Sequence, residues 1–100
     1  MEIYNKLVRD KIPEILDKKG VSYEKRVASS EEYKMELIKK LSEEVGEFTK
    51  DESAEELADV LEVVESLKKL PEYDNVEEVR LKKKEERGGF DKRIILKGSK

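Results

Sequence analysis

The sequence predicts a mainly α-helical protein, in which a helical bundle is completed by oligomerisation and accompanied by a small two-stranded β element. Three observations lead to this fold class. Apolar residues recur at helical spacing over most of the chain. Two of the helical stretches open with a Ser-x-x-Glu capping box. Only 36% of the 100 residues are hydrophobic whereas 47% are charged, so a monomer would have a thin core and we expect a dimer or a tetramer.

Helical spacing predicts four helices. The first is stopped by Gly20, and a start close to Asp10 would place Pro13 in the first turn, where proline is tolerated. The second and third helices open at the capping boxes of Ser29 and Ser53. The expected ranges are about 8–18, 29–49, 53–70 and 76–87.

The remaining segments predict a cap and two strands. Asp74 or Asn75 is expected to cap the fourth helix, and Gly88 to end it. Alternating apolar and polar residues predict one short strand over residues 21–27, and the aliphatic run near the C-terminus predicts another over 93–97. We expect these two strands to pair with each other.

The composition argues against several classes of function. The chain has no cysteine and no histidine, which removes disulfides, thiol catalysis and Ser/His or Cys/His catalysis. Its 22 basic and 25 acidic residues give a net charge of −3, which argues against general nucleic-acid binding. We expect one domain over residues 1–100, without a signal or membrane segment and located in the cytoplasm. The scarcity of Asn and Gln is typical of hyperthermophile proteins.

Two clusters of acids carry the strongest indication of function. The first contains Glu43, Glu44 and Glu47, and the second contains Glu56 and Asp59. Acids three residues apart share one face of a helix. Carboxylates that converge from two packed helices form a site for a hard cation such as Mg²⁺.

Helical phasing separates inward from outward acids. With residues placed about 100° apart around each helix, Glu44 and Glu56 fall within the apolar faces, and Glu47 and Asp59 fall at their margins. A carboxylate that faces a core is costly unless it is paired or bound to a cation. Two alternatives stay open: chance spacing on a surface rich in Glu and Lys, and a capping role for Glu56 opposite Ser53.

The two clusters and their flanks resemble one known family. The pattern Glu43-Glu44-x-x-Glu47 followed by Glu56-x-x-Asp59 is similar to the signature of the MazG-like, all-α NTP pyrophosphatase superfamily. The flanks, YNKLVRDKIP at residues 4–13 and ERGGFDKRI at residues 86–94, resemble its phosphoribosyl-ATP pyrophosphohydrolase-like branch. The resemblance covers essentially the whole chain.

The resemblance implies a Mg²⁺-dependent nucleotide pyrophosphohydrolase. Such enzymes cleave a nucleoside triphosphate between the α- and β-phosphates, in some cases to remove aberrant nucleotides. By the same resemblance, Glu43 and Glu47 are expected to be catalytic, with Glu43 orienting or activating water. The residues that match the metal ligands are Glu44, Glu47, Glu56 and Asp59. One departure is that only eight residues separate Glu47 from Glu56, which predicts a small pocket above the metal and leaves base and sugar open.

Several basic residues are candidates for binding phosphate. Arg9 and Lys11 lie in the N-terminal motif, and Arg87 and Arg93 flank a Gly-Gly turn whose backbone N–H groups can approach phosphate oxygens. The alternative is that they are salt-bridge partners, which is the more common role of lone basic residues. Two other functions also stay open: a non-catalytic helical interaction module, and an RNA-associated protein that uses the lysines at 82–84.

Overall fold

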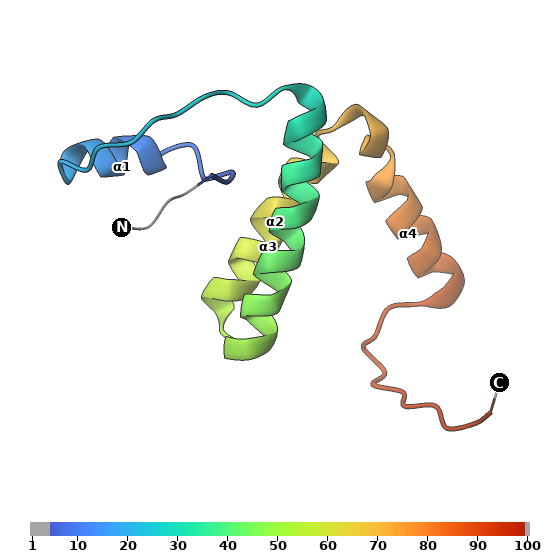
Figure 1. The fold of residues 1–100 in the computed structure, drawn as a ribbon. Coiled ribbons are helices and arrows are strands. Elements are labelled where there is room, and N and C mark those ends of the chain that lie inside the picture. The colour runs from blue at the N-terminus through green and yellow to red at the C-terminus, as the bar shows by residue number, and fades with distance from the viewer. Residues whose placement is uncertain (1–4, 100) are drawn as a thin grey trace.

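The computed structural model describes residues 5–99, so residue 4 of the N-terminal motif lies outside the described part. These residues form four α-helices and one short 3₁₀ helix (Figure 1). The prediction of a mainly helical fold is therefore confirmed. The helices are α1 (Ile12–Lys18), α2 (Ser30–Asp51), α3 (Ala54–Lys68), η1 (Pro71–Tyr73) and α4 (Val76–Arg87).

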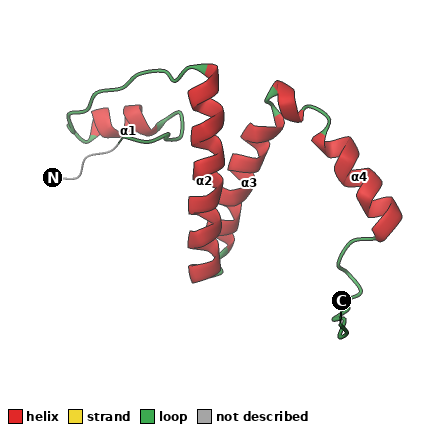
Figure 2. Ribbon diagram, turned by 45° about the vertical axis from the view of Figure 1, so that its right-hand side comes forward, coloured by secondary structure: helices red, strands yellow, loops and turns green. Residues whose placement is uncertain are grey.

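An antiparallel hairpin of α2 and α3 forms the centre of the molecule (Figures 1 and 2). Each helix begins as predicted, because the hydroxyl of Ser29 accepts the N–H of Glu32 and that of Ser53 accepts the N–H of Glu56, both at 3.2 Å. The turn between them is short. Glu52 adopts a left-handed conformation with φ 52°, which ends α2 and lets Ser53 cap α3 immediately afterwards.

The core of the hairpin is thin. Leu37 of α2 is 3% exposed and Val63 of α3 is 8% exposed, and no other described residue is as deeply buried. The radius of gyration is 18.0 Å, whereas a compact chain of this length has about 13 Å. A second set of large apolar residues on the same two helices remains exposed to solvent: Met35, Ile38, Val45, Leu57 and Leu61.

The predicted β element is wrong for the described residues, because neither 21–27 nor 93–97 forms a strand. Tyr23 instead packs back towards α1, where its hydroxyl donates a 2.8 Å hydrogen bond to Asp17 Oδ1. The other segment lies beyond α4 on the far side of the hairpin (Figure 1). A two-stranded ribbon needs an apolar face packed against another element, and these segments do not face each other.

Two helix ends also differ from the prediction. α1 begins at Ile12 instead of about Val8, with Pro13 in its first turn, because the fixed φ of proline favours a helix start and its missing N–H costs nothing there. Asn75 precedes α4 but its side chain makes no capping hydrogen bond. The end of α4 at Gly88 is as predicted, with φ 80° at that glycine.

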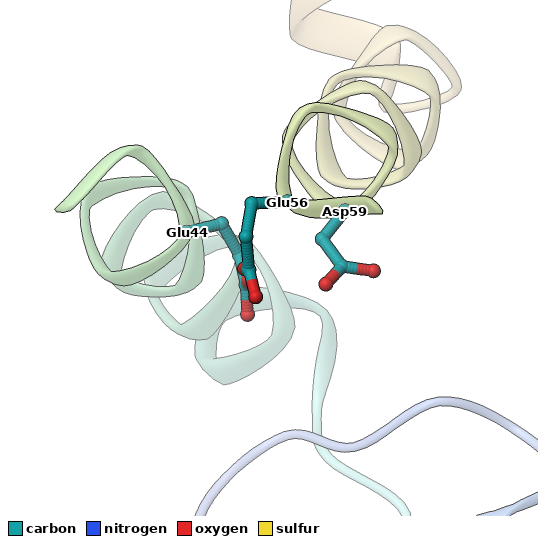
Figure 3. Close-up of side chains that lie close together, drawn as sticks. All are labelled: Glu44, Glu56 and Asp59. Carbon is teal, nitrogen blue, oxygen red and sulfur yellow. The ribbon is translucent and has the colours of Figure 1, made fainter. Parts of the chain in front are cut away.

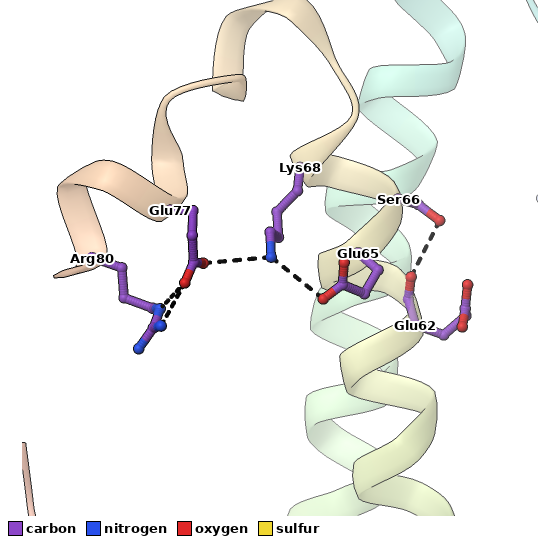
Figure 4. A network of polar contacts seen from close by, with 6 residues as sticks. All are labelled: Glu62, Glu65, Ser66, Lys68, Glu77 and Arg80. Carbon is purple, nitrogen blue, oxygen red and sulfur yellow. Dashed lines mark hydrogen bonds and ion pairs between the residues drawn. The ribbon is translucent and has the colours of Figure 1, made fainter.

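A polar network links α3 to α4 across η1 (Figure 4). Lys68 Nζ lies 3.4 Å from Glu65 Oε1 and 3.4 Å from Glu77 Oε2, and Arg80 Nε donates to Glu77 Oε1 at 3.0 Å. The hydrogen bonds from Arg80, followed by the charge of Lys68, lower the pKa of Glu77 to about 2. A lowered pKa stabilises the folded state above pH 4.5, and this contribution is lost as the pH falls towards 2. α4 diverges from the hairpin beyond this network.

None of the helices among residues 5–99 combines the length and apolar character that crossing a membrane requires.

Candidate metal centre

Three carboxylates meet near the turn of the hairpin. Glu44 comes from α2, and Glu56 and Asp59 come from the first two turns of α3 (Figure 3). One oxygen of each lies within 4.8 Å of the others. The three-residue spacing of Glu56 and Asp59 places both on the side of α3 that faces the end of α2. The predicted convergence of the two acidic clusters is therefore present for these three residues.

Glu44 and Glu56, the two acids that helical phasing predicted to face inward, are partly shielded from solvent. The side chain of Glu44 is 16% exposed, and Glu56 is also half-buried. Glu43 and Glu47 are exposed. Asp59 is half-buried as well, with a side chain 40% exposed. An acid on the apolar face of a helix is thus held partly away from water, where like charges repel each other more strongly.

The electrostatics of Glu56 reflect this crowding. Its pKa is raised above the ordinary value, first by desolvation and then by the charges of Asp59, Asp51, Glu47 and Glu44, in that order. The ionised form of Glu56 is therefore disfavoured when no cation is present. A cation among the three oxygens would relieve both the repulsion and the loss of hydration.

Two basic side chains already contact two of the three acids. Arg9 Nη2 donates a 2.7 Å hydrogen bond to Asp59 Oδ1. Lys40 Nζ lies 3.5 Å from Glu44 Oε1 and 3.9 Å from Glu43 Oε2. Arg9 is thus found in an ion pair, which was the alternative to a phosphate contact. Lys40 was missed, although its spacing of three and four residues from the two glutamates was a usable signal.

The other predicted site residues are less close. Glu47 is not part of the three-acid group, although its charge contributes to the raised pKa of Glu56. Lys11 directly precedes α1. Arg87 ends α4, and Arg93, with φ 56°, lies in the segment that follows. α4 and this C-terminal segment lie apart from the hairpin in both views (Figures 1 and 2).

Comparison with known proteins adds no family or fold assignment. No protein-family model, curated protein sequence or solved structure matches the chain.

The donor set fits a hard divalent cation. Oxygens on opposite sides of a Mg²⁺ ion lie about 4.2 Å apart, and those around Ca²⁺ lie somewhat further apart. Three oxygens cannot all lie opposite one another, and neighbouring oxygens around Mg²⁺ lie about 2.9 Å apart. Separations of up to 4.8 Å would therefore have to shorten by up to about 2 Å when Mg²⁺ binds. Three carboxylates without nitrogen or sulfur donors are ligands for Mg²⁺, Ca²⁺ or Mn²⁺ rather than for softer metals.

Proposed function

We propose that the chain is a Mg²⁺-dependent hydrolase that converts a nucleoside triphosphate, or a related nucleotide, to a monophosphate and pyrophosphate. The observation that carries the proposal is the convergence of Glu44, Glu56 and Asp59 from two helices at a half-buried position. The acidic motif and its two flanks supply the reaction class by resemblance. Removal of aberrant nucleotides in the cytoplasm is the role that we propose for such an activity.

The roles of the side chains follow from their positions. Glu44, Glu56 and Asp59 hold the cation. When bound, Mg²⁺ neutralises charge on the substrate phosphates and positions water for in-line attack. Because the chain has no histidine, the exposed carboxylates of Glu43 and Glu47 are the groups that orient the water or accept its proton.

The basic residues divide into two groups in this proposal. Arg9 already contacts Asp59, and Lys11 lies two residues further along the same segment, so both are assigned to the phosphates. α4, which ends at Arg87, and the segment after it, which contains Arg93, lie apart from the hairpin that carries the acids (Figure 1). A contact of these two arginines with the substrate would require a second copy of the chain.

The reaction is tested by incubating the pure protein with a panel of nucleoside triphosphates and Mg²⁺ and identifying the products by chromatography. We expect pyrophosphate and monophosphate, and we expect Glu44→Gln to lower the rate at least about 100-fold by removing a ligand to the cation. Glu55→Gln, in the exposed first turn of α3, is the matched control and should keep full activity.

Other outcomes of the same assay would contradict the proposal. Release of orthophosphate would indicate a different phosphatase chemistry. A complete lack of turnover over a broad panel, together with no stabilisation by Mg²⁺, would favour the non-catalytic interaction module. Salt-sensitive RNA binding that is lost on substitution of the lysines at 82–84 would favour the RNA-associated alternative.

A second copy is proposed as the partner that completes the bundle. On α2 and α3 the large apolar side chains left in water include Met35, which is 70% exposed, and Leu61, which is 56% exposed. Packing the hairpins of two copies together would bury these side chains of both copies, as in a four-helix bundle. We expect light scattering to give the mass of a dimer or tetramer, and Leu61→Glu to reduce it by placing a charge in the interface. A monomeric wild-type protein at micromolar concentration would contradict this assembly.

A further inference from the structure

We propose that Arg9 is an internal counter-ion of the acidic site, exchanged for the divalent cation. In this scheme Arg9 holds Asp59 while no cation is bound. Binding of the cation releases the guanidinium, which is then free to bind the phosphates of the substrate. The inference rests on the proposed function, because it requires that the three acids bind a metal ion.

The contact itself is the first argument. Arg9 Nη2 and Asp59 Oδ1 are 2.7 Å apart although 50 positions separate the two residues in sequence. The carboxylate of Asp59 lies to one side of those of Glu44 and Glu56 (Figure 3). The guanidinium of Arg9 therefore contacts the three-acid group at Asp59. It binds an oxygen of Asp59, which is a proposed ligand of the metal ion.

The chemistry of the guanidinium makes the two cations competitors. Arginine stays protonated at all accessible pH values, so it cannot lose its charge when a divalent ion arrives. Two positive charges that share one carboxylate repel each other, and the divalent ion interacts with all three acids. Arg9 is 57% and Asp59 40% exposed, and exposed ion pairs are weak. The exchange therefore costs little.

The placement of Arg9 distinguishes it from Lys40. Lys40 lies on α2 itself and pairs with Glu44 one helical turn away, so it remains beside the site whether or not the pair is formed. Arg9 belongs to the non-helical segment that precedes α1. Arg9 therefore reaches the acids from an element other than the two helices that carry them.

The released guanidinium suits the substrate. Arginine binds phosphate oxygens through two parallel N–H donors, and it would be set free at the place where the cation meets a triphosphate. Metal and nucleotide binding are therefore coupled through one residue. The nucleotide captures the arginine that would otherwise compete for Asp59, so each ligand increases the affinity for the other.

Titration calorimetry tests this exchange on the full chain, with MgCl₂ alone and then with a non-hydrolysable α,β-methylene triphosphate in the presence of MgCl₂. We expect Arg9→Gln to bind Mg²⁺ about two- to fivefold more tightly than the wild type, because a weak competitor is lost. The same variant should bind the nucleotide analogue about tenfold or more weakly. Arg26→Gln, which removes an ion pair with Glu32 at the start of α2, should leave both affinities unchanged.

A conservative variant separates charge from shape. Arg9→Lys keeps a competing positive charge, so its Mg²⁺ affinity should stay close to that of the wild type, but it loses the paired donors and should bind the analogue more weakly. The ¹⁵Nε signal of Arg9 provides a readout without nucleotide, because it should shift when MgCl₂ is added to the wild-type protein.

The outcomes distinguish this inference from the proposed function. If the wild-type chain does not bind Mg²⁺, the metal site and the exchange both fail. If the wild type binds Mg²⁺ but Arg9→Gln binds it equally or more weakly, the metal site stands and the exchange is overturned. Arg9 would in that case be a positioning residue that orients Asp59.

Discussion

Replacement of Glu56 by glutamine is expected to stabilise the chain in the absence of divalent cations and to abolish its stabilisation by Mg²⁺. The raised pKa of Glu56, caused first by desolvation and then by its acidic neighbours, means that its negative charge opposes folding at neutral pH. Its place in the first turn of α3 favours a negative charge through the helix dipole, but the raised pKa indicates that this attraction is outweighed. Glutamine keeps the shape and removes the charge.

The pH dependence follows from the sign of that shift. Below pH 4.5 Glu56 is protonated in both the folded and the unfolded chain, so the wild type and Glu56→Gln should differ little. As the pH rises through the raised pKa, the wild type loses the stability that protonated Glu56 provides. The variant has no group that ionises at this position, so it becomes more stable than the wild type. Thermal unfolding at pH 4 and pH 7 without metal measures the difference.

The metal response provides the larger effect. Mg²⁺ at about 100 times its Kd stabilises a protein by about 2.7 kcal/mol, which raises the Tm of a domain of this size by about 11–22 °C. We expect this rise for the wild type and for the control Glu55→Gln, and none for Glu56→Gln. The assignment of Glu56 would be contradicted if Glu56→Gln were less stable than the wild type at pH 7 without metal. It would also be contradicted if Mg²⁺ still raised the Tm of this variant.

Leu37→Ala is expected to destabilise the hairpin strongly. Leu37 is the most deeply buried residue described, at 3% exposure, and truncating a buried leucine to alanine costs about 2–5 kcal/mol. Because the core is thin, that loss is a large part of the total stability of a small domain, about 5–15 kcal/mol. Urea unfolding followed by circular dichroism at 222 nm should show a much lower midpoint.

The matched control for Leu37 is Met35→Ala on the same helix. Met35 is 70% exposed, so in the monomer its truncation should cost less than about 0.5 kcal/mol. Measurements at several protein concentrations separate this value from any contribution of an interface. Equal losses for the two variants at low concentration would mean that α2 packs through another face.

The elements that the sequence predicted well are those with local signals. The Ser29 and Ser53 caps depend on residues only a few positions apart, and the starts of α2 and α3 followed from them. Helical phasing placed Glu44 and Glu56 inward. Such information lies within one or two helical turns, so it can be extracted without knowing what the helix packs against.

The features that sequence reasoning missed depend on long-range contacts. The alternation in residues 21–27 is compatible with a strand, but a strand needs a partner, and the hydrogen bond from Tyr23 to Asp17 ties this segment to α1 instead. The pairing of Arg9 with Asp59 joins residues that no local spacing connects. Phosphate binding and ion pairing were both compatible with an arginine at that position, and only the path of the chain separates them.

The short turn of the hairpin has a consequence for the order of folding. All three acids of the candidate metal centre lie between positions 44 and 59, so closing the α2–α3 turn requires little loss of chain entropy. Helical hairpins with local contacts form within microseconds to milliseconds. Arg9 must span 50 positions to reach Asp59 and therefore arrives later. The carboxylates thus approach one another before their arginine does, and for that interval dissolved cations are the main external source of neutralising charge.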